Sequence, residues 1–286
     1  MYEILKREDL APVTKLFVVQ APAVARKARA GQFVIVRIHQ EGERVPLTIA
    51  DYDRQQGTIT LVFQEVGKTT MQMGTLQPGD HLASLTGPLG RPSEIRLYGT
   101  VLCVGGGVGI APLYPIARDL KAAGNTVISI IGARTQGLLF WEEKMRSVSD
   151  ELIVCTDDGS YGRKALVTIP LKELLEARRA IDRIWAIGPA IMMKFCALTA
   201  RSSGVPMEVS LNSIMVDGTG MCGACRVEVG GQTRFVCVDG PEFDGYQVDW
   251  DQLLARQRIY LDQEKLAVER WQQQCRHSSQ GGDEDV

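Results

Sequence analysis

From residue 100 onward, apolar runs of strand length alternate with segments of helical periodicity, and this alternation restricts the fold more than any other feature. The runs are expected to be strands at residues 100–104, 126–131, 151–156, 183–187 and 205–210. Helical patterns lie between them at residues 112–123, 138–146, 166–180 and 191–201. Strands that alternate with helices predict a parallel sheet with crossover helices. This part of the chain is therefore predicted to be an α/β domain of a nucleotide-binding type.

The segments before and after this α/β region have different hydrophobic patterns. Short runs rich in Val, Ile, Phe and Thr occur before residue 97, separated by glycine and proline turns, and they predict a β-barrel or sandwich. Residues 217–239 are rich in Gly and Cys, with short strands expected at 226–229 and 234–238. Residues 250–271 read as one charged amphipathic helix, and the acidic segment 278–286 is expected to be disordered.

Composition excludes several classes of protein. The chain has 32 Lys and Arg against 34 Asp and Glu, a net charge of −2, which argues against binding to nucleic acid. No apolar run approaches the ~20 residues of a membrane span. The charged first eight residues argue against a signal peptide, so we expect a cytoplasmic protein with reduced thiols. In that compartment, clustered cysteines indicate metal or redox chemistry.

A glycine cluster follows the first strand of the α/β pattern. Gly105, Gly106, Gly107 and Gly109 occur within five positions, just before the helical pattern that contains Pro112. Glycines at such a turn let the backbone approach a pyrophosphate, and the helix N-terminus offers free N–H donors. The sequence therefore predicts nucleotide binding here, although a plain tight turn would also use glycine. The next strand is followed by Arg134 rather than by an acidic residue.

Two further loops follow strands of the same predicted sheet. One contains Asp157, Asp158 and Gly159, and the other contains Gly188 and Pro189. Ligands of open α/β sheets bind beyond the carboxyl ends of the strands. Both loops are expected at the edge that carries the glycine cluster, although ordinary loop composition would also explain each one alone.

The N-terminal region contains two segments that could contact a phosphorylated ligand. They are Arg44-Val45-Pro46-Leu47-Thr48 and Gly67-Lys68-Thr69-Thr70. An arginine can pair with phosphate through two parallel hydrogen bonds. Taken alone, however, these residues fit a surface strand and a turn better than a ligand site.

The most specific pattern is Asp-x4-Cys-x2-Cys-x11-Cys, formed by Asp217, Cys222, Cys225 and Cys237. With Cys in place of Asp217, it would have the plant-type [2Fe–2S] spacing. Zinc is the alternative, but structural zinc favours a fourth Cys or His. Of the remaining cysteines, Cys103, Cys155 and Cys196 lie in apolar runs and are expected to be core residues. Cys275 lies near the end of the chain and has no assigned role.

Taken together, these motifs resemble the ferredoxin-reductase-like flavoproteins, in the branch of the dihydroorotate dehydrogenase electron-transfer subunits. The resemblance rests on Arg-x-Pro-Leu-Thr, Gly-Gly-Gly-Val-Gly-Ile-Ala-Pro and the Cys-rich segment, and it covers residues 1–275. Asp217 and the segments 47–51 and 243–250 are most similar to the small (alpha) subunits of NADH-dependent reduced ferredoxin:NADP+ oxidoreductases. In those heterodimers, the cluster of the small subunit is held by one Asp and three Cys.

The resemblance implies a set of cofactor-binding residues. The FAD site would consist of Arg44, Pro46, Leu47, Thr48, Val62, Phe63, Gln64, Gly67, Thr69 and Thr70. The NAD(H) site would consist of Gly105, Gly106, Gly107, Val108, Gly109, Ala111, Pro112, Arg134, Asp157, Asp158, Gly159, Gly188 and Pro189. The metal ligands of a [2Fe–2S] cluster would be Asp217, Cys222, Cys225 and Cys237. No residue is assigned as a catalytic acid or base.

The resemblance also implies an organisation and a function. A barrel that binds FAD would span residues 1–97, an α/β domain that binds NAD(H) 98–207, an iron–sulfur module 208–245 and a C-terminal helix 246–277. Hydride would pass between NAD(H) and FAD, and single electrons would pass through the cluster to a larger flavin and iron–sulfur subunit, with ferredoxin reached indirectly. Three alternatives remain at this point. They are the electron-transfer subunit of dihydroorotate dehydrogenase, the flavin subunit of a soluble hydrogenase or sulfur reductase, and a zinc-stabilised nucleotide sensor.

Overall fold

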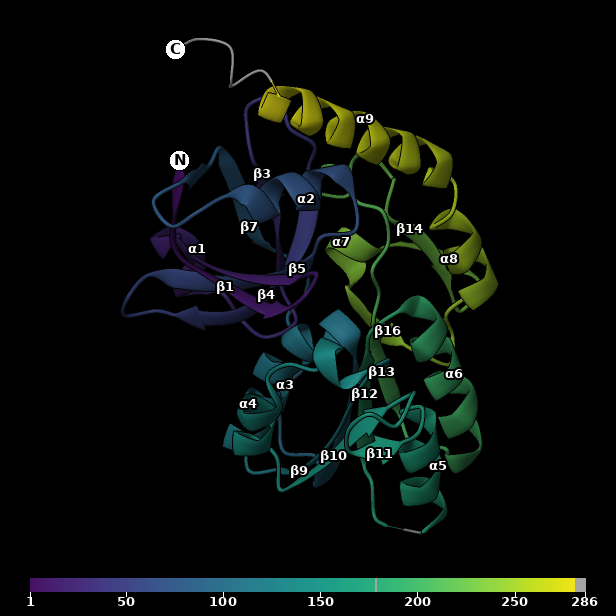
Figure 1. Ribbon diagram of the computed structural model, residues 1–286. Coiled ribbons are helices and arrows are strands. Elements are labelled where there is room, and N and C mark those ends of the chain that lie inside the picture. The colour runs from purple at the N-terminus through teal and green to yellow at the C-terminus, as the bar shows by residue number, and fades with distance from the viewer. Residues whose placement is uncertain (178, 281–286) are drawn as a thin grey trace.

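The N-terminal part of the chain is an antiparallel barrel that is nearly closed. The computed structural model describes residues 1–177 and 179–280. The barrel strands follow the order β6-β1-β2-β5-β4-β3-β7. The barrel occupies the upper left of Figure 1. Their bounds are β1 (Tyr2–Ala11), β2 (Thr14–Gln20), β3 (Phe33–Arg37), β4 (Val45–Asp53), β5 (Thr58–Gln64), β6 (His81–Leu82) and β7 (Ser84–Leu89). Helices α1 (Pro22–Lys27) and α2 (Lys68–Thr75) are inserted between strands. The fold class expected for this region is confirmed.

The second sheet lies below the barrel in Figure 1 and is parallel except at one edge. Its order is β11-β10-β9-β8-β12-β13-β16, with β16 antiparallel to β13. The bounds are β8 (Thr100–Gly106), β9 (Thr126–Ala133), β10 (Glu151–Thr156), β11 (Arg163–Lys164), β12 (Arg183–Ile187), β13 (Met207–Ser210) and β16 (Glu242–Asp244). The α/β prediction is therefore confirmed.

Helices cover both faces of this sheet because alternate strand residues point to opposite sides. On β8, Val101 and Cys103 pack on the side of α3 (Ile110–Ala122) and α4 (Glu142–Ser147). Leu102 and Val104 pack on the side of α5 (Thr168–Glu176) and α6 (Ala190–Ala200). The strand is consequently buried on both faces, which explains its continuous apolar sequence.

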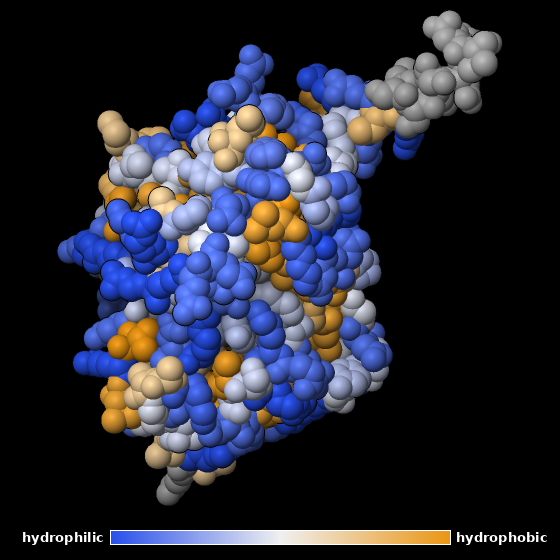
Figure 2. Space-filling view, turned by 90° about the vertical axis from the view of Figure 1, so that its left-hand side faces the viewer, coloured by the Kyte–Doolittle hydropathy of each residue, from blue (hydrophilic) through white to orange (hydrophobic). Residues whose placement is uncertain are grey.

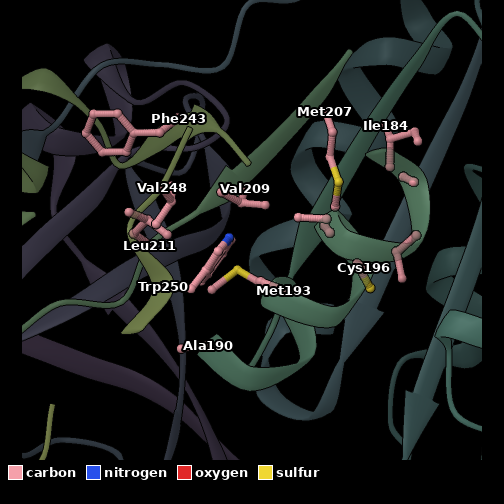
Figure 3. Close-up of a cluster of buried hydrophobic side chains, with 14 of the residues drawn as sticks. Ile184, Ala190, Met193, Cys196, Met207, Val209, Leu211, Phe243, Val248 and Trp250 are labelled. Carbon is pink, nitrogen blue, oxygen red and sulfur yellow. The ribbon is translucent and has the colours of Figure 1, made fainter. Parts of the chain in front are cut away.

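The cysteine-rich segment forms a small module that shares its core with the α/β domain. It contains the hairpin β14 (Arg226–Val229) and β15 (Gln232–Phe235), followed by α7 (Val236–Asp239). Figure 3 shows how Phe243, Val248 and Trp250 meet β13 and α6, where Met193 and Cys196 project from the helix. This common core holds the cysteine-rich segment in place relative to the parallel sheet.

The structure differs from the expected secondary structure at several places near the C-terminus. Residues 236–238, expected in a strand, belong to the helical turn α7, which begins where Phe235 leaves the hairpin. The single helix expected at 250–271 is divided into α8 (Trp250–Arg256) and α9 (Leu261–Gln280). Burial of Trp250 and Leu253 holds α8 against α6, whereas α9 crosses over α2 (Figure 1). One straight helix would not reach both surfaces.

Helix α9 extends through Gln280, so residues 278–280 are helical rather than disordered. Residues 281–286 of the expected disordered segment lie outside the described residues. No helix in the described part of the chain is long and apolar enough to cross a membrane. The face in Figure 2 is mostly hydrophilic, with hydrophobic side chains in separate groups.

Candidate functional site

The four predicted metal ligands form two close pairs. The Sγ atom of Cys222 lies 3.2 Å from Oδ1 of Asp217. The Sγ atoms of Cys225 and Cys237 are also 3.2 Å apart, because the β14–β15 hairpin brings the two ends of its segment together. Cys225 and Cys237 are buried, whereas Cys222 is exposed. The Cys225–Cys237 pair is therefore sheltered from solvent, whereas the Asp217–Cys222 pair lies near solvent.

The loop between Asp217 and Cys222 folds around the aspartate carboxylate. Backbone N–H groups of Thr219, Met221 and Cys222 each donate to it at 3.1 Å. Gly218 and Gly220 adopt φ values of +75° and +86°, which side-chain-bearing residues rarely adopt. Desolvation acts to raise the pKa of Asp217, but hydrogen bonds from Cys222 and Thr219 outweigh it and lower that pKa. The carboxylate is thus held as an anion beside a thiol.

The arrangement in pairs fits a cluster with two irons. Each iron of a [2Fe–2S] cluster takes two protein ligands, and thiolate and carboxylate both bind iron. Three thiols and one carboxylate in two close pairs therefore fit the two irons of such a cluster.

The other cysteines have different surroundings. Cys103, Cys155 and Cys196 are buried in the α/β core, as predicted. Burial raises the pKa of both Cys103 and Cys196 to about 12, so these thiols stay protonated. Cys275 lies exposed on α9.

The predicted glycine turn lies at the carboxyl end of β8, where Gly107–Gly109 form a short 3-10 helix. A Cβ on Gly109 would lie 2.3 Å from the carbonyl oxygen of Ile187, so only glycine fits this close approach to β12. Gly107 has a φ of +54°, and the space beside it is open. Ala111 and Pro112 follow in the first turn of α3. This open backbone at a helix N-terminus fits a pyrophosphate group.

The remaining predicted dinucleotide residues lie at the same sheet edge. Strand register pairs Gly106 with Gly132 on β9, and Ala133 with Thr156 on β10. Arg134 and Asp157 directly follow these strands and are exposed. Asp158 accepts hydrogen bonds from the hydroxyl and backbone N–H of Ser160, and these lower its pKa. Gly159 follows in the same loop, so β8, β9 and β10 all contribute to one edge.

Met192 is a neighbour of this edge that the sequence did not identify. A Cβ on Gly106 would lie 2.2 Å from its sulfur, and one on Gly188 would lie 2.8 Å from its terminal methyl. Gly188 and Pro189 lead from β12 into α6, which carries Met192. The side chain of Met192 therefore contacts both the glycine turn after β8 and the Gly188–Pro189 segment after β12.

A cavity of about 760 Å³ brings together four of the predicted flavin residues. They are Arg44, Gly67, Thr69 and Thr70, and Lys68 lies beside them. Gly67 is the N-cap of α2, and the hydroxyl of Thr69 donates to the carboxylate of Glu43. A basic side chain and a helix N-terminus at one cavity fit the phosphates of a dinucleotide.

The other predicted flavin residues lie on the paired strands β4 and β5 and do not line this cavity. They are Pro46, Leu47, Thr48, Val62, Phe63 and Gln64. Phe63 packs edge-on against Phe17 in the barrel core, with ring centroids 5.0 Å apart. Val62 is buried where the barrel meets the α/β domain. The side chains of these two neighbouring residues are both buried, on opposite faces of β5.

Sequence reasoning missed the far wall of the cavity. This wall consists of Ile214, Val216, Tyr260, Gln263, Glu264 and Ala267. Positions 260, 263, 264 and 267 repeat at helical spacing, which marks one face of a helix. That spacing is visible in the sequence, but the surface it faces is not.

A partly buried carboxyl group between the domains was also not predicted from the sequence. Glu242 on β16 accepts hydrogen bonds from the hydroxyl of Ser93 and, at 3.2 Å, from the indole Nε1 of Trp185 on β12. Burial raises the pKa of Glu242 to about 7. The three residues connect the segment after the barrel, the parallel sheet and the cysteine-rich module.

One comparison with known proteins matches the cysteine-rich segment, and the others cover most of the chain. Residues 212–249 match a family model described as the iron–sulfur cluster binding domain of dihydroorotate dehydrogenase B. A Thermotoga maritima protein named as a homologue of the dihydroorotate dehydrogenase B (NAD(+)) electron transfer subunit is 53% identical over 269 residues, which cover 94% of this chain and 95% of the relative. The Bacillus caldolyticus electron transfer subunit is 37% identical over 235 residues, covering 79% and 88%.

A solved structure of the NADH-dependent reduced ferredoxin-NADP oxidoreductase, described in terms of flavin-based electron bifurcation, has a chain that is 52% identical with a TM-score of 0.90. The match covers 95% of this chain and 98% of that chain. Amycolatopsis cytochrome P450 reductase shares the fold at a TM-score of 0.61 and 22% identity, covering 71% and 66%. From the identity and coverage of these relatives, we conclude that the chain belongs to the family of dihydroorotate dehydrogenase B electron transfer subunits and their homologues, whose members are electron-transfer subunits of oxidoreductase complexes.

Proposed function

We propose that this chain is the small subunit of an electron-bifurcating, NADH-dependent reduced ferredoxin:NADP+ oxidoreductase. The observation that carries the proposal is the pairing of Asp217 with Cys222 beside the pair Cys225 and Cys237. The carboxylate of Asp217 stands at the position of the first of the four cysteines in the plant-type spacing. The similarity over 95% of the chain to a structure of that enzyme supports the proposal.

The residues of this chain would bind and position three cofactors. Arg44 and the N-terminus of α2 would hold the phosphates of FAD, and the glycine turn before α3 would hold those of NAD(H). Asp217, Cys222, Cys225 and Cys237 would bind a [2Fe–2S] cluster. When bound, FAD supplies hydride chemistry with NAD(H), and the cluster supplies single-electron transfer. The proposed domains are 1–97, 98–207 and 208–245, followed by the C-terminal helices.

We assign no general acid or base to this chain. The carboxylates of Asp157 and Asp158 lie in an exposed loop, and the partly buried Glu242 lies at the junction of the domains. The protein would therefore contribute by orienting the bound groups and by its electrostatics.

A partner follows from the same proposal. Electrons that reach a cluster near the exposed Cys222 need an acceptor, and we propose a larger flavin and iron–sulfur subunit. To test this, the untagged chain is expressed together with the proteins encoded by neighbouring genes, one of which carries an affinity tag. The tagged protein is then isolated with whatever binds to it. Recovery of a subunit that contains flavin and iron, in a complex that uses ferredoxin and NADP+, supports the proposal.

The second candidate function is the electron transfer subunit of dihydroorotate dehydrogenase. The match of residues 212–249 to its iron–sulfur domain favours it. Co-purification with a subunit that oxidises dihydroorotate, and no activity with ferredoxin, would replace our proposal with this one. A colourless protein that contains zinc and no flavin would contradict both functions.

Cofactor content of the isolated chain provides a more direct test. We expect a yellow-brown protein whose flavin is reduced by NADH. Arg44→Ala should lower the flavin content, because it removes a side chain that lines the cavity. Arg96→Ala is the matched control, since Arg96 is exposed and lies outside the cavity.

A further inference from the structure

The cavity with Arg44 and α2 is completed by the C-terminal segment. Tyr260, Gln263 and Glu264 line it, although at least 190 positions separate them from the residues of the barrel and α2 that line its other side. Tyr260 directly precedes α9, and Gln263 and Glu264 lie in the first turn of this helix. Helix α9 crosses the barrel beside α2 (Figure 1). Most other side chains of α9 in the described part of the helix are exposed.

The position of the cavity on the barrel indicates which half of FAD it receives. The glycine turn Gly107–Gly109 packs against β5, so the end of the flavin site that meets NAD(H) lies toward β5 and the α/β domain. The cavity lies instead at the start of β4 and of α2, and it includes Arg44 and Thr69. A dinucleotide that runs from β5 across Arg44 would therefore place its adenine half beside α9.

The chemistry of the α9 wall fits a nucleobase. Tyr260 offers an aromatic ring that is half exposed, and aromatic rings stack on bases. Gln263 offers an amide that both donates and accepts hydrogen bonds, as the edge of adenine requires. The phosphate-binding chemistry of Arg44 and Lys68 lies on the opposite wall. Ring and amide on one side and positive charge on the other match an adenylate group.

We propose that Tyr260 and Gln263 recognise the adenine half of FAD, so that α9 is the nucleobase wall of the flavin site. This inference rests on the proposed function, because it requires FAD to be bound in this cavity. It assigns a binding role to a segment that lies beyond the iron–sulfur domain match at residues 212–249. It also explains why α9 packs across the barrel rather than continuing along α8.

The test uses the full-length chain, freed of flavin and titrated separately with FAD and with FMN, which lacks the adenylate. The quenching of flavin fluorescence on binding gives the Kd for FAD and the Kd for FMN. Tyr260→Ala should raise the Kd for FAD about tenfold, within the range of an aromatic–base stack, and leave the Kd for FMN within about twofold. Tyr260→Phe should bind FAD as the unmodified chain does, because it keeps the ring.

Two further variants sharpen the test. Gln263→Ala should raise the Kd for FAD about threefold, the loss of one hydrogen bond. It also keeps the test decisive if Tyr260→Ala does not fold, since Gln263 is exposed. Glu269→Ala is the control, because Glu269 is exposed and lies on the opposite side of α9 from positions 260, 263 and 264. Its Kd values for both flavins should be unchanged.

The outcomes separate this inference from the proposed function. An unchanged Kd for FAD in both Tyr260→Ala and Gln263→Ala, or equal weakening of FAD and FMN, overturns the role of α9 and leaves the flavin site in place. An unmodified chain that binds neither flavin overturns the proposed function and this inference together. A selective loss of FAD binding in the two variants supports the inference.

Discussion

The sulfur atoms of Cys225 and Cys237 lie 3.2 Å apart although twelve positions separate the residues in the chain. The β14–β15 hairpin produces this contact, since Arg226 pairs with Phe235 at its open end. Asp217 and Cys222 meet at the same distance within one glycine-containing loop. A local turn and a hairpin are therefore sufficient to assemble two ligand pairs.

Replacement of Asp217 tests the carboxylate as an iron ligand. Asp217→Ala should reduce iron to less than about half of the unmodified content and change the EPR signal, because one iron loses a protein ligand. Asp217→Cys should retain iron, since it restores four thiolates in plant-type spacing. Asp251→Ala, at an exposed residue paired with Lys194, is the control. An unchanged signal and iron content in Asp217→Ala would remove Asp217 from the ligand set.

The close approach of Gly109 to β12 predicts a specific sensitivity in the glycine turn. Gly109→Ala would place a Cβ 2.3 Å from the carbonyl oxygen of Ile187, so the start of α3 must shift. We expect a loss of about 1–3 kcal/mol in the free energy of unfolding and weaker NADH binding. Gly137→Ala has open space around its Cβ and should change neither quantity. Denaturant unfolding and NADH titration measure both, and equal behaviour of the two variants would contradict the prediction.

The partly buried carboxyl of Glu242 predicts a pH dependence of stability. Burial raises its pKa from 4.5 to about 7 in the folded chain, so the folded state binds a proton more tightly than the unfolded state does. Its contribution is complete below about pH 4.5 and is lost as pH rises through about 7. Across this window we expect a decrease on the order of 1–3 kcal/mol in the free energy of unfolding.

Glu242→Gln isolates this contribution, because glutamine has no charge to lose and can keep both contacts. Its amide oxygen can accept from the indole N–H of Trp185, and its N–H can donate to the hydroxyl oxygen of Ser93. The difference in unfolding free energy between the variant and the unmodified chain should grow in favour of the variant between pH 4.5 and 7. Chemical unfolding at a series of pH values measures it. Parallel pH profiles of the two proteins would show that Glu242 does not titrate in this window.

An ion pair at the contact between barrel and α/β domain predicts sensitivity to salt. The guanidinium of Arg118 on α3 lies 2.6 Å from the carboxylate of Asp51 on β4. Arg118→Ala should lower the free energy of unfolding by about 1 kcal/mol, and by less in high salt, because the pair is partly exposed. Arg146→Ala, which breaks a pair within α4, should have a smaller effect. Equal losses in the free energy of unfolding in Arg118→Ala and Arg146→Ala, with neither loss dependent on salt, would contradict this prediction.

The sequence by itself determined five of the seven strands of the α/β sheet, the helices between them, the glycine turn and the spacing of Asp217 and the three cysteines. These features depend on burial patterns and turns within short stretches, so periodicity and spacing report them directly. The division between α8 and α9 was missed, because it depends on which surfaces the two helices pack against. The burial of Phe63 in the barrel core was missed for the same reason.

Only the tertiary structure decided how distant segments meet. Glu242 contacts Ser93 across 149 positions, and Tyr260 faces a cavity whose other wall includes Arg44. Each contact depends on the packing of whole domains against one another. Helical spacing at positions 260, 263, 264 and 267 marks one face of a helix, but it does not say which surface that face meets. Local chemistry thus predicted groups that suit phosphate and iron, while domain packing determined which of them lie together.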